Sequence, residues 1–254
     1  MRDEQSLIEH VKGGGRIAAP EEMSAQYRGE IVRVMSVLVD SWLAAAAGFA
    51  DMVNRAPGLQ ERQAMLRIAT DKLNHASTVL ELLRPFGVQP DLYLNTYPWA
   101  ARIGREVDLG LRRIAGDKRL NVFHYPLQSW HDALFVNWLV GASLAIQLRD
   151  LADSSYSPLA LALSGMAQAE ERLAATAQPL LAAAIRRDGK AGPAQAALDY
   201  WYPRAAATFG HRDSDRFATY KRYGLRKESN EVLLKRWCLL IDPQLAELGL
   251  VSPA

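Results

Sequence analysis

The stretch around His75 has the spacing of a metal-binding helix. In "RIATDKLNHASTVLELL", residues 67–83, the histidine lies three residues after Lys72. Helix bundles that bind two metal ions use Glu-x-x-His for this purpose, because side chains at positions i and i+3 project from the same helix face. Here a lysine occupies the position of the glutamate, and an ammonium group does not bind a metal cation. The stretch is therefore either an unusual metal site or one that has lost its metal.

Two other segments carry residues that could do chemistry. "SWHDALF", residues 129–135, offers His131 and Asp132. The chain has no Gly-x-Ser-x-Gly nucleophile motif and no glycine-rich phosphate loop to accompany them. "KGGGR", residues 12–16, follows no strand pattern, so we interpret it as a flexible stretch and not as a nucleotide motif.

The segment 211–227 is rich in basic residues. We consider two interpretations of it: a binding site for phosphates, such as those of CoA, or an ordinary solvated loop. Only two acids, Asp213 and Asp215, oppose its basic residues, which are His211, Arg212, Arg216, Lys221, Arg222, Arg226 and Lys227.

Composition excludes several classes of protein. The 254 residues are 49% hydrophobic and 23% charged with a formal net charge of +2, which favours a globular protein and gives no reason to expect nucleic acid or membrane as a partner. Cys238 is the single cysteine, so neither an intrachain disulfide nor a cysteine-based zinc site is expected. The polar start "MRDEQSLIEH" lacks the apolar core of a signal peptide, and we expect a cytoplasmic protein.

The elements that position these residues are predicted to be helices. The apolar run "WLAAAAGFA", residues 42–50, is too short to span a bilayer and is expected to be part of a buried helix. Residues 1–19 are expected to be flexible, residues 88–125 to form a crossover with one or two short helices, and residues 211–227 to form a loop. Helical periodicity and breakers predict helices at Pro20–Arg55, Leu59–Leu83, Leu127–Asp153, Pro158–Arg187, Ala194–Phe209 and Ser229–Leu248.

This order of elements predicts an all-α fold. Two helix hairpins joined by one long crossover are typical of a ferritin-like four-helix bundle, and the additional C-terminal helices would pack outside it. No linker divides the chain, so residues 1–254 are expected to form a single domain.

The sequence resembles the catalytic A subunit family of phenylacetyl-CoA epoxidase, a ferritin-like diiron monooxygenase. The matching stretches follow the order of that family and cover most of the chain: "MSAQYRGEIVRVMS" at 23–36, "NRAPGLQERQAML" at 54–66, "DKLNH" at 71–75, "VFHYPLQSW" at 122–130, "SYSP" at 155–158, "YWYP" at 200–203, and "SNEVLLKRW…PQLAELGLVSP" at 229–253.

The resemblance carries the metal ligands of the family onto six positions. Each hairpin of the family supplies one carboxylate and, later, one Glu-x-x-His. The corresponding residues here are Trp42, Lys72, His75, Gly141, Glu170 and Leu173. Four of the six ligands are thus replaced. Arg33 and Lys118 align with positions near the CoA-binding region of the family, and we include them as candidate ligand-binding residues.

The remaining ligands do not suit a diiron centre. Two ferrous ions bring about four positive charges, which such sites balance with roughly four carboxylates and two imidazoles. We therefore predict that the family's diiron cofactor is lost. His75 is then either a remnant ligand or a core histidine. Lys72 either points inward and pairs with Glu170, or extends along its stem to the surface. We favour the buried pair, and expect Trp42 to fill the volume left by the metals while Gly141 makes room for the indole.

These expectations define a function and its alternatives. We expect a non-catalytic paralogue of the epoxidase A subunit, acting as a structural or regulatory subunit or as a binder of an acyl-CoA-like ligand. The family also contains a non-catalytic ferritin-like subunit, so we expect a homodimer or a heterodimer with a related subunit. One alternative is an enzyme that uses His75, Lys72 and Glu170 as acid–base groups on a CoA thioester. Another is a metal site built from residues that the resemblance does not align.

Overall fold

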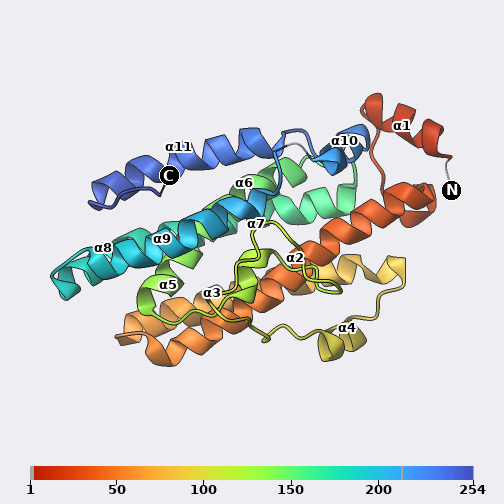
Figure 1. The fold of residues 1–254 in the computed structure, drawn as a ribbon. Coiled ribbons are helices and arrows are strands. Elements are labelled where there is room, and N and C mark those ends of the chain that lie inside the picture. Colours follow the sequence, from red (N-terminus) through yellow and green to blue (C-terminus); the bar gives the residue numbers. More distant parts are fainter. Residues whose placement is uncertain (1–2, 213, 254) are drawn as a thin grey trace.

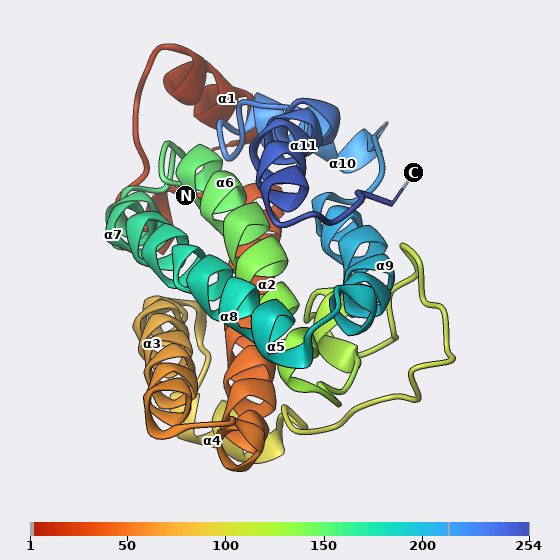
Figure 2. The same cartoon turned by 90° about the vertical axis from the view of Figure 1, so that its left-hand side faces the viewer.

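The computed structural model describes residues 3–212 and 214–253 and is built of helices (Figure 1). Two long hairpins form its centre, as the sequence predicted. In the first, α2 (Ala25–Met52) packs along α3 (Leu59–Leu82). In the second, α6 (Gly141–Leu151) packs along α7 (Ser157–Ala175). Figure 2 shows these helices obliquely, with α3 and the visible part of α2 below α6 and α7. The predicted all-α, ferritin-like arrangement is confirmed.

The crossover between the hairpins contains the short helices that were predicted. They are α4 (Pro90–Thr96) and the 3-10 turn η4 (Asn121–His124). The helix that follows is continuous but not uniform: α5 (Trp130–Phe135) runs through a π-helical segment, η5 (Val136–Val140), into α6. It begins three residues later than the predicted Leu127, because the Ser129 side chain accepts the Asp132 backbone N–H and caps the helix there.

The C-terminal helices pack outside the two hairpins (Figure 1). Helix α9 (Gly192–Ala206) lies against α5, and α11 (Asn230–Glu247) lies against α6. The predicted helix Pro158–Arg187 is divided at Thr176 into α7 and α8 (Ala177–Asp188). The short 3-10 turn η6 (Ala207–Phe209) ends α9.

The N-terminal half of the chain differs from prediction at two points. The helix predicted from Pro20 begins at Ala25, because Ser24 caps it by accepting the Tyr27 backbone N–H at 3.2 Å, whereas Pro20–Glu22 forms only the 3-10 turn η1. Residues 53–55 form a further 3-10 turn, η2 (Val53–Arg55), after α2.

Part of the segment 1–19, which the sequence predicted to be flexible, is helical in the structure. Helix α1 (Glu4–Lys12) buries Leu7 and Ile8, and Asp3 caps it by accepting the Ser6 backbone N–H. Ile17 is fully buried and forms a β-bridge with Tyr156. The apolar face of α1 supplies the burial that orders this segment. Residues 1 and 2 lie outside the described residues.

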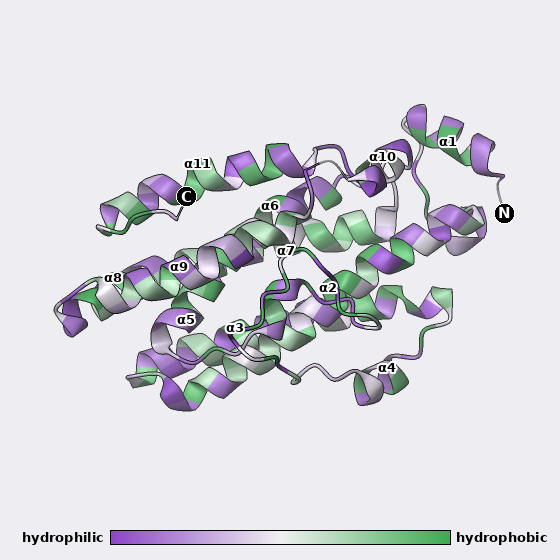
Figure 3. Cartoon of the chain, viewed as in Figure 1, coloured by the Kyte–Doolittle hydropathy of each residue, from purple (hydrophilic) through white to green (hydrophobic). Residues whose placement is uncertain are grey.

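The basic segment 211–227 is also more ordered than predicted. Part of it forms α10 (Asp215–Arg222), a largely hydrophilic helix (Figure 3) that buries none of its side chains. Residue 213 lies outside the described residues. Two of its basic residues, His211 and Arg216, line a cavity that is described below.

One helical stretch, Ala25–Arg55, is apolar and long enough to cross a membrane by length and composition alone. Of its most apolar window, 78% is buried inside the structure. The core helix of a globular fold meets the same criteria, and this burial is what a core helix requires. The predicted buried helix around "WLAAAAGFA" is confirmed.

Candidate functional site

Four of the six carried-over residues meet at one point between the hairpins. Helix α2 supplies Trp42, α3 supplies Lys72 and His75, and α7 supplies Glu170. All four are buried: Glu170 is 0% exposed and Lys72 is 3% exposed. Lys72 and His75 reach the same point because residues three apart in a helix share one face.

The Glu170 carboxylate is the hub of this buried centre. Its Oε1 accepts a hydrogen bond from Trp42 Nε1 at 3.0 Å, and His75 Nδ1 lies 3.3 Å from the same oxygen. Lys72 donates from Nζ to Oε2. The indole of Trp42 and the imidazole of His75 pack at an angle, with ring centroids 5.3 Å apart. Both carboxylate oxygens are therefore engaged by N–H donors.

The predicted ion pair between Lys72 and Glu170 is confirmed, and the alternative of a surface-directed Lys72 is wrong. Burial alone would raise the pKa of Glu170, since it removes the carboxylate from water. The charge of Lys72 and the hydrogen bonds from His75 and Lys72 outweigh burial, so the pKa of Glu170 is lowered to about 2. At neutral pH the structure therefore favours a carboxylate at this position and not a carboxylic acid.

Gly141 and Leu173 serve the packing of the two C-terminal hairpin helices. A Cβ atom added at Gly141 would lie 3.1 Å from Ala174 Cβ and 3.8 Å from the Glu170 carbonyl oxygen. Gly141 thus makes room for the backbone of α7, and the expected role of accommodating the Trp42 indole is corrected. Leu173 is buried in the apolar core, and its carbonyl oxygen accepts a hydrogen bond from Asn137 Nδ2 in the π-helical segment at 2.9 Å.

The donors at this centre do not fit a diiron cofactor. It holds one carboxylate and one imidazole, whereas diiron sites use about four carboxylates and two imidazoles. The carboxylate already binds an ammonium, an indole N–H and an imidazole. Among residues 3–212 and 214–253, no group of three or more His, Cys, Asp or Glu side chains could hold a metal ion.

The sequence did not single out a second cluster, which holds the crossover against α2. Asp40 is buried in the apolar stretch of α2, where its carboxylate accepts from the Tyr93 hydroxyl and from the Lys118 backbone N–H, the latter at 3.3 Å. The Ser41 hydroxyl accepts the Leu120 backbone N–H at 2.9 Å. A charged residue inside an otherwise apolar helix is the signal that could have revealed this anchor.

Burial raises the pKa of Asp40 to about 6, although the hydrogen bonds from Tyr93 and Lys118 oppose the shift. Between the ordinary pKa of 3.8 and about 6, the folded protein keeps a proton that the unfolded chain has released. The contribution of this group to stability is therefore complete below the unfolded pKa and is lost as the pH rises to about 6.

This shift gives a testable pH dependence. We expect the free energy of unfolding of the wild type to fall relative to that of Asp40→Asn as the pH rises from about 4 to about 6, and the difference to be constant above that. Urea unfolding at several pH values measures it. A difference that stays constant across this range would show that Asp40 has an ordinary pKa.

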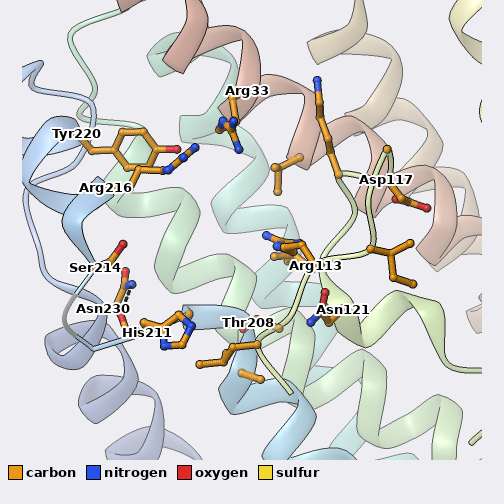
Figure 4. A pocket seen from close by; sticks show the side chains of 18 residues that line it. Arg33, Arg113, Asp117, Asn121, Thr208, His211, Ser214, Arg216, Tyr220 and Asn230 are labelled. Carbon is orange, nitrogen blue, oxygen red and sulfur yellow. Dashed lines mark hydrogen bonds between the residues drawn. The ribbon is translucent and has the colours of Figure 1, made fainter. Parts of the chain in front are cut away.

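A cavity of about 560 Å³ lies between α2, the crossover, η6 and α10. Figure 4 shows the guanidinium groups of Arg33, Arg113 and Arg216 around it, from α2, the crossover and α10 respectively. Its lining also includes Lys118, Asp117, Asn121, Thr208, His211, Ser214, Tyr220 and Asn230. The structure thus brings Arg33 and Lys118 together with part of the basic segment.

The cavity has an excess of positive charge. Asp117 is paired with Arg119, whose Nε lies 2.9 Å from its Oδ2. Glu30 approaches Arg216 at 3.6 Å and Arg33 at 4.0 Å. Burial lowers the pKa of the Arg113 guanidinium. A cavity with these groups attracts anions.

The other candidate residues have structural roles. Arg226 pairs with Asp150 at 2.9 Å and Lys227 with Asp153 at 2.8 Å, so both hold the basic segment against the end of α6. His131 Nε2 lies 3.3 Å from Asp188 Oδ2. None of these residues lies at the buried centre.

Comparison with known proteins gives one result at the level of the family. A family model described as phenylacetic acid catabolic protein matches residues 1–254. No curated protein matches the chain.

Proposed function

We propose, from the premise that this chain belongs to the phenylacetic acid catabolic protein family, that it is a non-catalytic member without a diiron centre. It serves aromatic catabolism of the phenylacetate type as a cytoplasmic structural or regulatory subunit. Its ligand is an anion of the acyl-CoA type, bound in the cationic cavity.

The observation that carries this proposal is the Lys72–Glu170 pair. The pair neutralises the one carboxylate that could help to balance the charge of a metal ion. Removing Lys72 from the carboxylate would leave a buried ammonium without a partner, which is costly. A metal ion would therefore have to displace three N–H donors from Glu170 and overcome the repulsion of a buried cation.

Anaerobic loading with Fe(II), followed by desalting and elemental analysis, tests the missing metal centre. We expect far less than one iron per chain for the wild type, and no increase in melting temperature on adding Fe(II). Lys72→Glu is the matched variant: it restores Glu-x-x-His beside Glu170, and we expect it to retain more iron than the wild type. Two irons per wild-type chain would contradict the proposal.

The cationic cavity predicts that free CoA binds without an acyl group. We expect Arg113→Gln to weaken CoA binding about tenfold, since one charge-assisted phosphate contact contributes on the order of 1.5–3 kcal/mol. Arg67→Gln, on the exposed side of α3, is the control and should bind as the wild type does. Isothermal titration calorimetry at two salt concentrations measures both. If both variants bind CoA with equal affinity, CoA does not bind in this cavity.

The alternative of an acid–base enzyme receives no support from the geometry. His75, Lys72 and Glu170 do not line the cationic cavity, so a thioester held there would not meet them. We therefore prefer the non-catalytic role to the acid–base enzyme.

We also propose a homodimer or a heterodimer with a related ferritin-like subunit. Membership of the family and the resemblance to a family with paired subunits support this assembly. Sedimentation at micromolar concentration and a pull-down from the native host test it. A monomer that recovers no related subunit would contradict the proposal.

A further inference from the structure

A separate cavity of about 350 Å³ lies where the N-terminal helix approaches the basic segment. Three stretches of the chain line it: the glycine-rich loop after α1, the turn between α6 and α7, and the end of α10 with the residues that follow. Figure 1 shows α1 and α10 at this same end of the fold. Its lining and that of the cationic cavity have no described residue in common. We call it the N-terminal cavity.

Backbone hydrogen bonds hold the three stretches together at Ser155. The Ile17 N–H donates to the Ser155 carbonyl oxygen at 2.8 Å, and the Ser155 N–H donates to the Gly224 carbonyl oxygen at 2.8 Å. Gly224 has a φ of +62°, and a Cβ atom there would lie 2.7 Å from Val11 Cγ1, so this close approach requires glycine. The walls of the cavity are thus fixed by the fold, which lowers the ordering cost of binding a ligand.

The N-terminal cavity has an excess of positive charge. Four cationic side chains line it, and Asp153 is the acid among its lining residues. The four are Arg16, Lys221, Arg226 and Lys227. Arg226 pairs with Asp150 at 2.9 Å, and Lys227 pairs with Asp153 at 2.8 Å. These two carboxylates offset two of the four cations, so an excess of two positive charges remains for Arg16 and Lys221.

Arg16 can bind an anion while it holds the turn between α6 and α7. Its Nη1 donates to the backbone carbonyl of Ser154 and lies 3.3 Å from the carbonyl oxygen of Asp153. Both contacts use the same nitrogen, and a guanidinium has five N–H donors, so donors remain for a second partner. Such donors bind phosphate oxygens in pairs. Lys221, an exposed side chain at the end of α10, supplies the other charge.

We propose that the N-terminal cavity binds a phosphate-type dianion, either inorganic phosphate or a small phosphate monoester, between Arg16 and Lys221. A phosphate group carries a charge of about −1.5 to −2 at pH 7, which matches the excess of two positive charges. The volume is larger than the roughly 150 Å³ that accommodates benzene, so an organic group has room beside the phosphate. This site is separate from the anion binding stated under Proposed function and does not depend on it.

Calorimetric titration of the full chain with inorganic phosphate and with glycerol 3-phosphate tests the proposal. We expect Arg16→Gln and Lys221→Gln each to weaken phosphate binding about tenfold, since each removes one charge-assisted contact. Lys12→Gln is the matched control: it removes the same charge from the exposed end of α1, outside the cavity lining, and should bind within about twofold of the wild type. Tighter binding of glycerol 3-phosphate than of phosphate identifies a monoester as the ligand class, and equal or weaker binding identifies inorganic phosphate.

Hydrogen–deuterium exchange locates the bound anion. We expect phosphate to slow exchange in peptides that cover residues 13–17 and 221–227, compared with sodium chloride at the same ionic strength. Arg113→Gln removes a cation from the cationic cavity and should leave this protection unchanged. Circular dichroism melts show whether each variant is folded. Lys221→Gln changes an exposed side chain and keeps the test decisive if Arg16→Gln disturbs the turn that Arg16 holds.

Four results would overturn the inference and leave the proposed function intact. They are no binding of either anion, a phosphate affinity that neither Arg16→Gln nor Lys221→Gln lowers, protection that Arg113→Gln removes, and a Lys12→Gln effect as large as that of Lys221→Gln, which would indicate general attraction to a basic surface. Arg16→Gln should leave the affinity for free CoA within about twofold of the wild type, so the two sites are tested separately.

Discussion

We expect Lys72→Ala to lower the free energy of unfolding by about 3–5 kcal/mol, because it leaves the Glu170 carboxylate buried without its cationic partner. Glu170 is fully buried, so water cannot replace the lost ammonium at low cost. For a chain of this length, such a loss corresponds to a fall of roughly 10 °C in melting temperature. Thermal and urea unfolding of the purified variant measure it.

The double variant Lys72→Met with Glu170→Gln is the matched control. It removes both charges at nearly constant volume, and we expect it to be much milder than Lys72→Ala, because an intact buried ion pair contributes little net stability. A Lys72→Ala protein that melts within a degree or two of the wild type would show that Lys72 is not a buried partner of Glu170.

The same pair predicts a sensitivity to acid. The pKa of Glu170 is lowered to about 2 in the folded protein, against an ordinary value of 4.5. The stability from this shift is present above pH 4.5 and is lost as the pH falls toward 2. The double variant lacks the carboxylate and should lose less stability over this range. This trend is opposite in sign to that of Asp40, so the two groups can be separated by pH.

Asp132→Ala is expected to have the second large effect, about 3–4 kcal/mol of unfolding free energy. Asp132 is 2% exposed and links three parts of the chain. Its Oδ1 accepts the indole N–H of Trp201 on α9 at 2.6 Å. Its Oδ2 accepts a hydrogen bond from Arg105 in the crossover at 2.8 Å. The same oxygen accepts the backbone N–H groups of Gln128 and Ser129, just before the start of α5.

Two comparisons sharpen this second prediction. Asp132→Asn keeps one acceptor oxygen and should lose less stability than Asp132→Ala. Asp199→Ala removes an exposed carboxylate from α9 and should change stability by no more than about 0.5 kcal/mol. Denaturant unfolding of all three variants gives the order. Equal stability of Asp132→Ala and Asp199→Ala would refute the role of Asp132 as an internal link.

Helical spacing and the family resemblance together were sufficient to place Lys72 beside Glu170. Lys72 and His75 share a face of α3 by periodicity alone, and the resemblance placed Glu170 at the corresponding depth of α7. A buried lysine needs an anionic partner, so charge balance selected between the two directions that its side chain could take. The structure confirms the inward direction of Lys72, which pairs with Glu170.

Sequence reasoning was less successful where contacts join distant segments. It predicted that Gly141 makes room for the indole of Trp42, whereas Gly141 lies close to Ala174 on α7. The neighbour of a glycine in a helix depends on how that helix packs against another, which the sequence does not give. It also missed Asp40, whose partners Tyr93 and Lys118 lie far along the chain.

By itself, the sequence determined the all-α class and the two hairpins with their crossover, because helical periodicity is a local property. Only the tertiary structure decided that Arg33, Arg113 and Arg216 surround one cavity. These residues come from α2, the crossover and α10. Their meeting depends on how the crossover and the basic segment pack against the bundle, which no short stretch of sequence encodes.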